Sequence, residues 1–235
     1  MSIFRFRRFD VDDCGCGQKI CSDSVLFGAW FFRAFPDARS VMDVGTGSGV
    51  LALLAADLIP QATVEAVEID ETAYEVACNN FQNSPFQNRL RAYLADVTSL
   101  DCNNTYDLIV CNPPFFASGI KAEDARRAIA RHEGNLNAAS MARFAALHLC
   151  HDGHLGLITP ADREQDVIFD AEMAGLTPAR ILRVSSSVRK PHSRILWDFV
   201  RRTDRLSDKS LSIRDSHGQY SPEYLALVED IYLKL

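Results

Sequence analysis

The sequence predicts an α/β protein built on a doubly wound sheet of seven mostly parallel strands. Between residues 40 and 200, short runs rich in β-branched residues alternate with stretches of helical periodicity. Residues 43–49 read DVGTGSG, a glycine-rich turn between the first run and the following helix. With 235 residues and 47% hydrophobic content, we expect one domain over 1–235: an N-terminal extension (1–39), a core (40–200) and a C-terminal extension (201–235).

The first half of the core supplies four strands and two helices. We expect the strands at residues 40–44, 63–69, 90–94 and 106–111. Apolar residues at helical spacing predict helices over 50–58 and 72–82, each following a loop that can aim the helix N-terminus at a ligand. The polar stretch 117–135 is longer than an ordinary connection, so we interpret it as a functional loop.

The second half of the core supplies the remaining strands. Residues 137–149 are expected as a helix, 153–158 as a strand and 163–173 as another helix. Two closing strands, 177–184 and 195–200, bring the predicted total to seven. Apolar residues at helical spacing in the tail, 220–235, predict an amphipathic helix that docks on the core.

Charge and hydropathy exclude some classes of protein. A formal net charge of −6 argues against an overall basic surface wrapped in nucleic acid, although local basic clusters can still meet phosphates. The longest apolar runs are too short for a membrane span, and the N-terminal segment lacks the apolar stretch of a secretory signal. We therefore expect a cytoplasmic protein with no membrane partner and with its seven cysteines reduced.

The glycine-rich turn is a candidate cofactor site. Gly45, Gly47 and Gly49 allow the backbone to approach a ligand closely. The pattern departs from the dinucleotide fingerprint, because Val50 takes the place of the third glycine. The carboxylate of Asp43 would repel a pyrophosphate but suits the ammonium group of S-adenosylmethionine, which we expect as the cofactor.

Two further acidic residues follow the next predicted strands. Glu68 stands about 20 residues after the turn, where a carboxylate can accept both ribose hydroxyls of a nucleoside. Asp96 can accept a hydrogen bond from the cofactor's adenine amino group, with Val97 flanking the ring. Each acid alone has a plain alternative as a solvated strand end or helix cap. Together they favour a ligand, because carboxyl ends of parallel strands form the binding edge of such sheets.

The fourth strand runs directly into Asn112, Pro113, Pro114 and Phe115, which we predict as the catalytic turn. The Asn112 side-chain oxygen and the Pro113 carbonyl offer two acceptors, and these fit the two N–H bonds of one amino group. Holding both bonds favours pyramidalisation of an exocyclic base amine and frees its lone pair for methyl transfer. Phe115 can stack on an extruded base, whereas the plain alternative is a strand-ending turn with Phe115 in the core.

At these residues the chain resembles the seven-stranded, Rossmann-like class I methyltransferases whose catalytic turn is asparagine-proline-proline-aromatic. Four further segments, FRFRRFDV at residues 4–11, KICSD at 19–23, PHSR at 191–194 and YSPEY at 220–224, resemble the bacterial tRNA1(Val) (adenine-N6)-methyltransferase family. That resemblance implies methylation of the adenine immediately 3′ of the anticodon of a valine tRNA, with tRNA as a transient partner.

The resemblance also implies that Lys19, Ser22 and Asp23 form part of a lid over the cofactor. The sequence departs from the family pattern there, because Cys21 and Ser24 stand where the family usually has glycines. Phe115 replaces the commoner tyrosine, which removes a hydroxyl but keeps the stacking face. Since phenylalanine at that place also occurs in ribosomal-RNA guanine-N2 methyltransferases, an adenine or guanine of ribosomal RNA stays open as an alternative target.

Arg131, His132 and Arg194 are the candidate contacts to RNA phosphates, with solvated surface roles as the alternative. The histidines and cysteine at 148–154 and the cysteines at 14–21 lack the paired spacing of a zinc site, so we expect no metal. Protein-glutamine N5 methyltransfer is a rival reaction, because an amide presents the same two N–H bonds. A non-catalytic cofactor-binding module is the other rival. We expect no stable protein partner.

Overall fold

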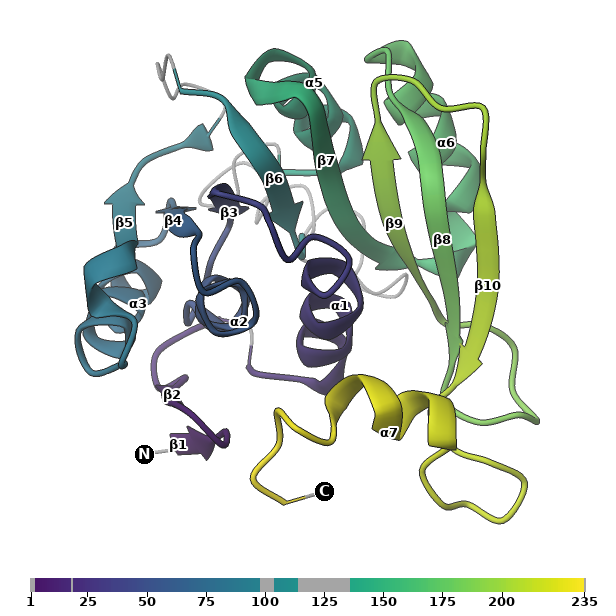
Figure 1. Ribbon diagram of the computed structural model, residues 1–235, viewed down its shortest axis with the longest axis horizontal. Helices are drawn as coiled ribbons and strands as arrows, with labels where there is room; N and C mark the ends of the chain where they lie inside the picture. The colour runs from purple at the N-terminus through teal and green to yellow at the C-terminus, as the bar shows by residue number, and fades with distance from the viewer. Residues whose placement is uncertain (1–2, 18, 98–103, 114–135, 235) are drawn as a thin grey trace, which may run out of the picture.

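The computed structural model describes residues 3–17, 19–97, 104–113 and 136–234, and its centre is an eight-stranded sheet (Figure 1). The strand order is β10-β8-β9-β7-β6-β3-β4-β5. β9 runs antiparallel to β7 and β8, and the other neighbours are parallel. The predicted α/β class and mostly parallel sheet are confirmed. The strands are β3 (Ser40–Val44), β4 (Thr63–Glu68), β5 (Leu90–Leu94), β6 (Tyr106–Cys111), β7 (Leu149–Pro160), β8 (Thr177–Ser185), β9 (Arg194–Val200) and β10 (Ser207–Ser212).

Helices cover both faces of this sheet because its central strands are apolar on both sides. Val41 and Leu108 face one core cluster, and Met42 and Ile109 face the other. On the first face lie α1 (Ser22–Phe32), α2 (Val50–Leu58), α3 (Glu71–Gln82) and α7 (Pro222–Val228). On the second lie α5 (Ala138–His148) and α6 (Glu164–Met173); short 3₁₀ turns are η1 (Gln87–Arg89) and η3 (Ala161–Arg163).

Helix α1 was absent from the sequence-based prediction. Eight of its residues are buried, so it has no exposed polar face and no amphipathic period to detect. Two predicted boundaries differ from the structure by more than two residues. β7 begins at Leu149 rather than at residue 153, and α7 ends at Val228 rather than at residue 235. Beyond α7, Tyr232 pairs with Phe6 in an isolated bridge instead of continuing the helix.

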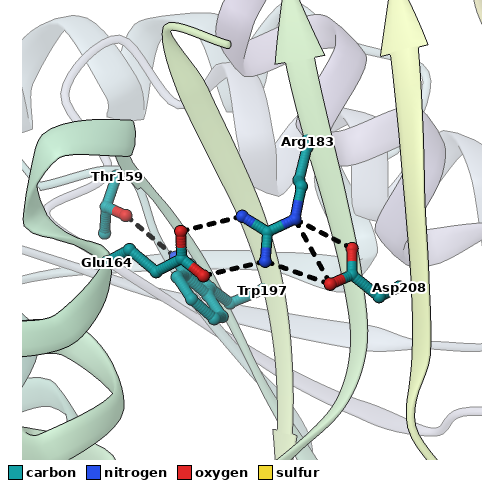
Figure 2. Close-up of polar contacts among 5 residues, drawn as sticks. All are labelled: Thr159, Glu164, Arg183, Trp197 and Asp208. Atoms are coloured by element: carbon teal, nitrogen blue, oxygen red, sulfur yellow. Dashed lines mark hydrogen bonds and ion pairs between the residues drawn. The ribbon is translucent and has the colours of Figure 1, made fainter.

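The eighth strand, β10, was also missed, because its sequence SDKSLS lacks the apolar run of a buried strand. It is the outermost strand on one side of the sheet, and only Leu211 among its residues is buried. Arg183 on β8 ties it to the core, as Figure 2 shows: the guanidinium donates to Asp208 on β10 at 2.9 Å and to both oxygens of Glu164 at 2.8 Å. These bonds raise the pKa of Arg183 and lower that of Glu164. Trp197 is fully buried, and its Nε1 donates to Thr159 Oγ1.

A second charged group lies between β7, β8 and β9. Asp198 is 1% exposed and accepts from Arg180 Nε at 2.6 Å, while its other oxygen lies 2.7 Å from His154 Nδ1. The Arg180 guanidinium stacks over the rings of Trp30 and Phe35, with its carbon 4.6 and 5.0 Å from their centroids. Trp30 therefore lies half-buried against a cation rather than in the core proper.

The two chain ends pack against each other, and Figure 1 shows both on the same side of the molecule. A hairpin of β1 (Ile3–Arg5) and β2 (Asp10–Asp12) places Phe6 on the Tyr232 ring, and Arg7 N donates to Ile231 O at 2.9 Å. Both segments join the core cluster of the α1–α2 face. Among the helices that the structure describes, none has the length and apolar composition needed to cross a membrane.

Candidate active site

The carboxyl ends of β3, β4, β5 and β6 meet at one edge of the sheet, as the sequence predicts for a ligand site. Backbone bonds join the loops that follow these strands. Gly45 N donates to Val67 O at 2.8 Å, and Ala95 N donates to Glu68 O at 2.9 Å. The predicted cofactor residues of three separate strands are therefore neighbours in space.

The glycine turn between β3 and α2 has positive φ angles at Gly45, Gly47 and Gly49 (69°, 56° and 82°). A side chain at Gly49 would place its Cβ 2.5 Å from a ring carbon of Phe81, so close helix packing excludes one there. At Gly47 a Cβ would meet no heavy atom within 4 Å. The turn therefore has a packed side toward α3 and an open side at Gly47, where a ligand can approach the backbone.

Asp43, at the carboxyl end of β3, is completely buried. Its Oδ2 accepts from Thr46 Oγ1 at 2.6 Å and from Ala52 N at 3.1 Å, which braces the turn against the start of α2. Its Oδ1 is buried with no partner in the part of the chain that the structure describes. Burial, only partly offset by the two hydrogen bonds, raises the pKa of Asp43 to about 7. Direct contact with a cofactor ammonium stays a prediction.

Glu68, at the end of β4, holds three backbone amides. Its Oε2 accepts from Gly47 N at 2.8 Å, and its Oε1 accepts from Ile69 N and Asp70 N at 2.9 and 3.0 Å. A carboxylate has about four acceptor positions, so capacity remains for a ribose hydroxyl. The carboxylate also links the glycine turn directly to the next strand end. Its neighbour across the sheet edge, Asp96, is partly exposed, and Val97 is buried in the core cluster on the α5–α6 side.

Asn112 follows β6 directly and is the predicted catalytic residue that the structure describes in most detail. Its Nδ2 donates to Ser24 Oγ at 2.9 Å, whereas its Oδ1 is buried without a partner among the described residues. A buried acceptor without a partner is costly, and such atoms are rare in folded proteins. Pro113 is buried next to it. The predictions for Pro114 and Phe115 lie outside the described residues.

The predicted lid residues lie on the N-terminal side of the site. Lys19 Nζ donates to Asp13 O at 2.6 Å and Asp13 Oδ1 at 3.2 Å. The segment before it is tied to the glycine turn, because Asn80 Nδ2 on α3 donates to both Asp12 O and Ser48 O at 2.8 Å. Asp12, directly before Asp13, therefore lies beside the turn.

Ser22 and Asp23 open helix α1. Asp23 forms an ion pair with Arg194, whose Nε lies 3.0 Å from Asp23 Oδ2. The structure therefore brings together a residue predicted for the cofactor and one predicted for RNA phosphate. A phosphate would share Arg194 with this carboxylate. The predictions for Arg131 and His132 lie outside the described residues.

The two candidate metal clusters of the sequence have separate partners. His151 pairs with the neighbouring Asp152, His154 with Asp198, and the His148 ring lies 3.4 Å from Asn104 O. Within the described parts of the chain, no group of three or more metal-binding side chains converges. Cys16 is buried, and burial raises its pKa to about 11.

Comparison with known proteins assigns this site to a family. A family model described as the methyltransferase small domain matches residues 27–165. The tRNA1(Val) (adenine(37)-N6)-methyltransferase of Porphyromonas gingivalis is 39% identical, covering 98% of this chain and 94% of its own. That of Photobacterium profundum is 37% identical, covering 99% and 98%. The chain belongs to the tRNA1(Val) (adenine(37)-N6)-methyltransferase family.

Solved structures agree with a methyltransferase fold. A predicted O-methyltransferase from Agrobacterium tumefaciens superposes with a TM-score of 0.69 at 19% identity, covering 91% of this chain and 99% of that one. A TehB-like SAM-dependent methyltransferase from Corynebacterium glutamicum gives a TM-score of 0.53 at 18% identity, covering 79% and 90%. At these identities the likeness concerns the fold alone.

Three residues of this methyltransferase site were missed by sequence reasoning: Ser24, Thr46 and Asn80. Thr46 lies inside the DVGTGSG motif, and a hydroxyl three residues after a buried carboxylate is a usable signal. Asn80 and Ser24 carry no such signal, because their partners are 32 and 88 residues away in the chain. Only the packing of α1 against the end of β6, and of α3 against the glycine turn, reveals them.

Proposed function

We propose that this chain transfers the methyl group of S-adenosylmethionine to N6 of adenine 37 in tRNA1(Val). The observation that carries the proposal is Asn112 Oδ1, a buried acceptor with no partner among the described residues, at the carboxyl end of β6. It lies at the same sheet edge as the glycine turn, in a chain that covers its curated relatives almost end to end.

The residues present fit the cofactor. Bound there, S-adenosylmethionine would supply a methyl group from its positively charged sulfur, and the demethylated cofactor would be the leaving group, a neutral thioether. Glu68 retains acceptor capacity for a ribose hydroxyl after holding three amides. The open side of Gly47 gives the cofactor access to the backbone, and Asp96 stands at the next strand end. Oδ1 of Asp43 has no partner among the described residues, and a cationic ligand at the turn would favour the ionised form of this carboxyl over the protonated form that burial favours.

Asn112 supplies the chemistry on the acceptor side. Its Oδ1 accepts one N–H of the adenine amino group, and the Pro113 carbonyl is proposed to accept the other. Holding both bonds turns the nitrogen lone pair out of the ring plane and toward the methyl donor. Transfer leaves the methylated nitrogen positively charged, and this nitrogen then releases one proton to water. No strong base is therefore required to activate the amine beforehand.

The same sheet edge offers cations for the RNA backbone. The turns at 186–193 and 213–219 follow β8 and β10, whose carboxyl ends lie at the edge of the site. Arg189, Lys190 and Arg214 on these turns are exposed. The turns are joined, because Val188 N donates to Arg214 O at 3.2 Å. These side chains, with Arg194, are proposed phosphate contacts on an otherwise acidic protein.

The wider setting is part of the proposal. All 235 residues are proposed to work as one methyltransferase domain, because both terminal extensions pack into the core cluster of the α1–α2 face. The protein is proposed to act in the cytoplasm, to bind tRNA only transiently and to have no stable protein partner.

The deciding experiment transfers labelled methyl from S-adenosylmethionine to unmodified tRNA1(Val) and identifies the modified nucleoside by mass. Wild type should yield 6-methyladenosine at position 37 and none in a transcript with guanine there. Asn112→Ala should lower the rate by about a thousandfold, the scale seen when a preorganised polar contact to a reacting group is lost. Asn83→Ala, on the exposed end of α3, serves as the matched control.

The rivals are separated in the same assay. Ribosomal RNA and a release-factor protein are offered in parallel with the tRNA. Label on either of these, with tRNA1(Val) unlabelled and the cofactor bound, would overturn the substrate while keeping the methyltransferase. Appearance of 2-methylguanosine would overturn the target base.

A further inference from the structure

Ser24 lies in the first turn of α1 and contacts the proposed catalytic side chain from 88 residues away in sequence. It is 5% exposed, and its Oγ accepts a hydrogen bond of 2.9 Å from Asn112 Nδ2. The oxygen and nitrogen of a carboxamide are fixed on one planar group and point apart. A partner that holds Nδ2 therefore also decides where Oδ1 points.

The direction of this bond matters, because a serine hydroxyl can also donate. Cys21 Sγ lies 3.8 Å from Ser24 Oγ and can take the hydroxyl hydrogen as a weak acceptor. With that hydrogen occupied, the hydroxyl oxygen is left to accept from Asn112. The three side chains then form a directed chain that ends at Asn112 Oδ1, which has no partner among the described residues. The chain uses Cys21 and Ser24, the two departures from the family's usual glycines.

The hydroxyl is held on a rigid element. Eight residues of α1 are buried, and the residue before Ser24 is anchored by the Asp23–Arg194 ion pair at 3.0 Å. Gly28, one turn later, is packed so closely that a Cβ there would lie 2.9 Å from Leu54 on α2. The helix therefore has little freedom to slide and carry Ser24 away from Asn112.

We propose that Ser24 is a positioning residue for methyl transfer: its hydroxyl oxygen fixes the Asn112 carboxamide with Oδ1 facing the reacting amine. This inference rests on the proposed function for its catalytic consequence. Without the serine oxygen, the carboxamide can rotate and present Nδ2, which repels the N–H of the amine. The effect is therefore on the reacting step rather than on cofactor binding.

The first test measures the carboxamide itself and does not depend on the substrate. In protein labelled with ¹⁵N-asparagine, the Asn112 side-chain signals are assigned by their loss in Asn112→Ala. We expect Ser24→Ala to shift these signals and to speed exchange of their hydrogens with solvent. Unchanged signals in Ser24→Ala would overturn the proposal, whichever substrate the enzyme uses.

The second test is kinetic and uses the full chain with tRNA1(Val). Ser24→Ala should lower kcat by about tenfold, equal to about 1.4 kcal/mol of barrier, while the KM for tRNA and the Kd for S-adenosylmethionine stay within about twofold. In the Asn112→Ala background, single-turnover rates should show no further loss on adding Ser24→Ala. Equal loss in both backgrounds, or a weaker cofactor Kd at unchanged kcat, would show that Ser24 acts independently of Asn112.

The matched control is Ser84→Ala. Ser84 is also 5% exposed and its Oγ also makes two hydrogen bonds, to Phe81 O and from Phe86 N, but it lies between the end of α3 and the amino end of β5. It should lower Tm without lowering kcat. If instead wild type leaves tRNA unlabelled while the Asn112 signals still respond to Ser24→Ala, the proposed substrate fails and the positioning role stands.

Discussion

At the carboxyl ends of β3 and β6, Oδ1 of Asp43 and Oδ1 of Asn112 are buried without partners among the described residues. In the β8–β9–β10 half of the sheet, both oxygens of the buried Asp198 are bonded, and so are both oxygens of Glu164. One described atom departs from this contrast. Arg180 Nη2 is also buried without a hydrogen-bond partner, although its guanidinium stacks over Trp30 and Phe35.

The difference separates two uses of buried polarity. In the second half, opposite charges satisfy each other, so the groups hold strands together and offer nothing to a ligand. In the first half, the side chains of Asp43 and Asn112 are each bonded through one terminal atom, and their Oδ1 atoms have no partner among the described residues. Those open positions are the ones that a cationic cofactor and an amine can fill. The contrast predicts that changes to the buried or bonded charges Asp198 and Arg183 alter stability, whereas changes to Asp43 or Asn112 alter ligand binding or pH response.

The largest stability effect is expected from Asp198→Ala. It leaves the half-buried Arg180 without its carboxylate partner. Loss of one member of a fully buried ion pair costs about 3–5 kcal/mol, so we expect about 3 kcal/mol here. Urea unfolding measures the change, and Asp198→Asn, which keeps an acceptor, is the milder control. The folded variant should bind S-adenosylmethionine as wild type does. A loss of affinity without loss of stability would break the comparison.

Next in size is Gly49→Ala compared with Gly47→Ala. Both demand a positive φ, but only the Gly49 substitution drives a Cβ into Phe81. We expect Gly49→Ala to lower the unfolding free energy by roughly 2–3 kcal/mol and Gly47→Ala by about 1 kcal/mol. Calorimetry measures the affinity of each variant for S-adenosylmethionine and should show the reverse order. Relative to its loss of unfolding free energy, Gly47→Ala should lose more affinity than Gly49→Ala does. Equal losses of both quantities would argue against an open side of the turn.

A pH effect is expected at Asp43, whose pKa is raised to about 7 by burial. The folded state holds this proton more tightly than the unfolded state, so the resulting stability is present at low pH and is lost as pH rises toward 7. Between pH 5 and 7 the loss should be about 2 kcal/mol. Asp43→Asn should remove this slope from the unfolding free energy. Parallel pH profiles for variant and wild type would be evidence that Asp43 is ionised throughout.

The smallest effect is expected from Arg183→Met, which keeps an apolar stem but removes the bonds to Glu164 and Asp208. Because all three side chains are partly exposed, the cost should be about 1 kcal/mol. Arg183 lowers the pKa of Glu164, so the gap from wild type should narrow as pH falls and Glu164 protonates. Urea unfolding at two pH values tests this, with methyltransfer as the control that should stay unchanged.

Sequence reasoning reached the sheet and the cofactor turn, but not every element around them. The strands that end in Asp43, Glu68 and Asn112 were predicted because each pairs an apolar run with a local polar signal. Helix α1 was not predicted because it is buried on nearly all sides. Strand β10 was not predicted because it is a polar strand at the outer side of the sheet. Hydrophobic periodicity and composition predict a helix or strand only where one face of the element differs in polarity from the other.

The sequence by itself determined the α/β class, the motifs at the strand ends and the family, because these depend on local residue order. Only the tertiary structure decided which motif residues face inward. It showed Asp43 buried rather than open, Arg194 paired with Asp23, and Ser24 bonded to Asn112. Such contacts join residues far apart in the chain, and their geometry depends on how helices and strands pack rather than on any local pattern.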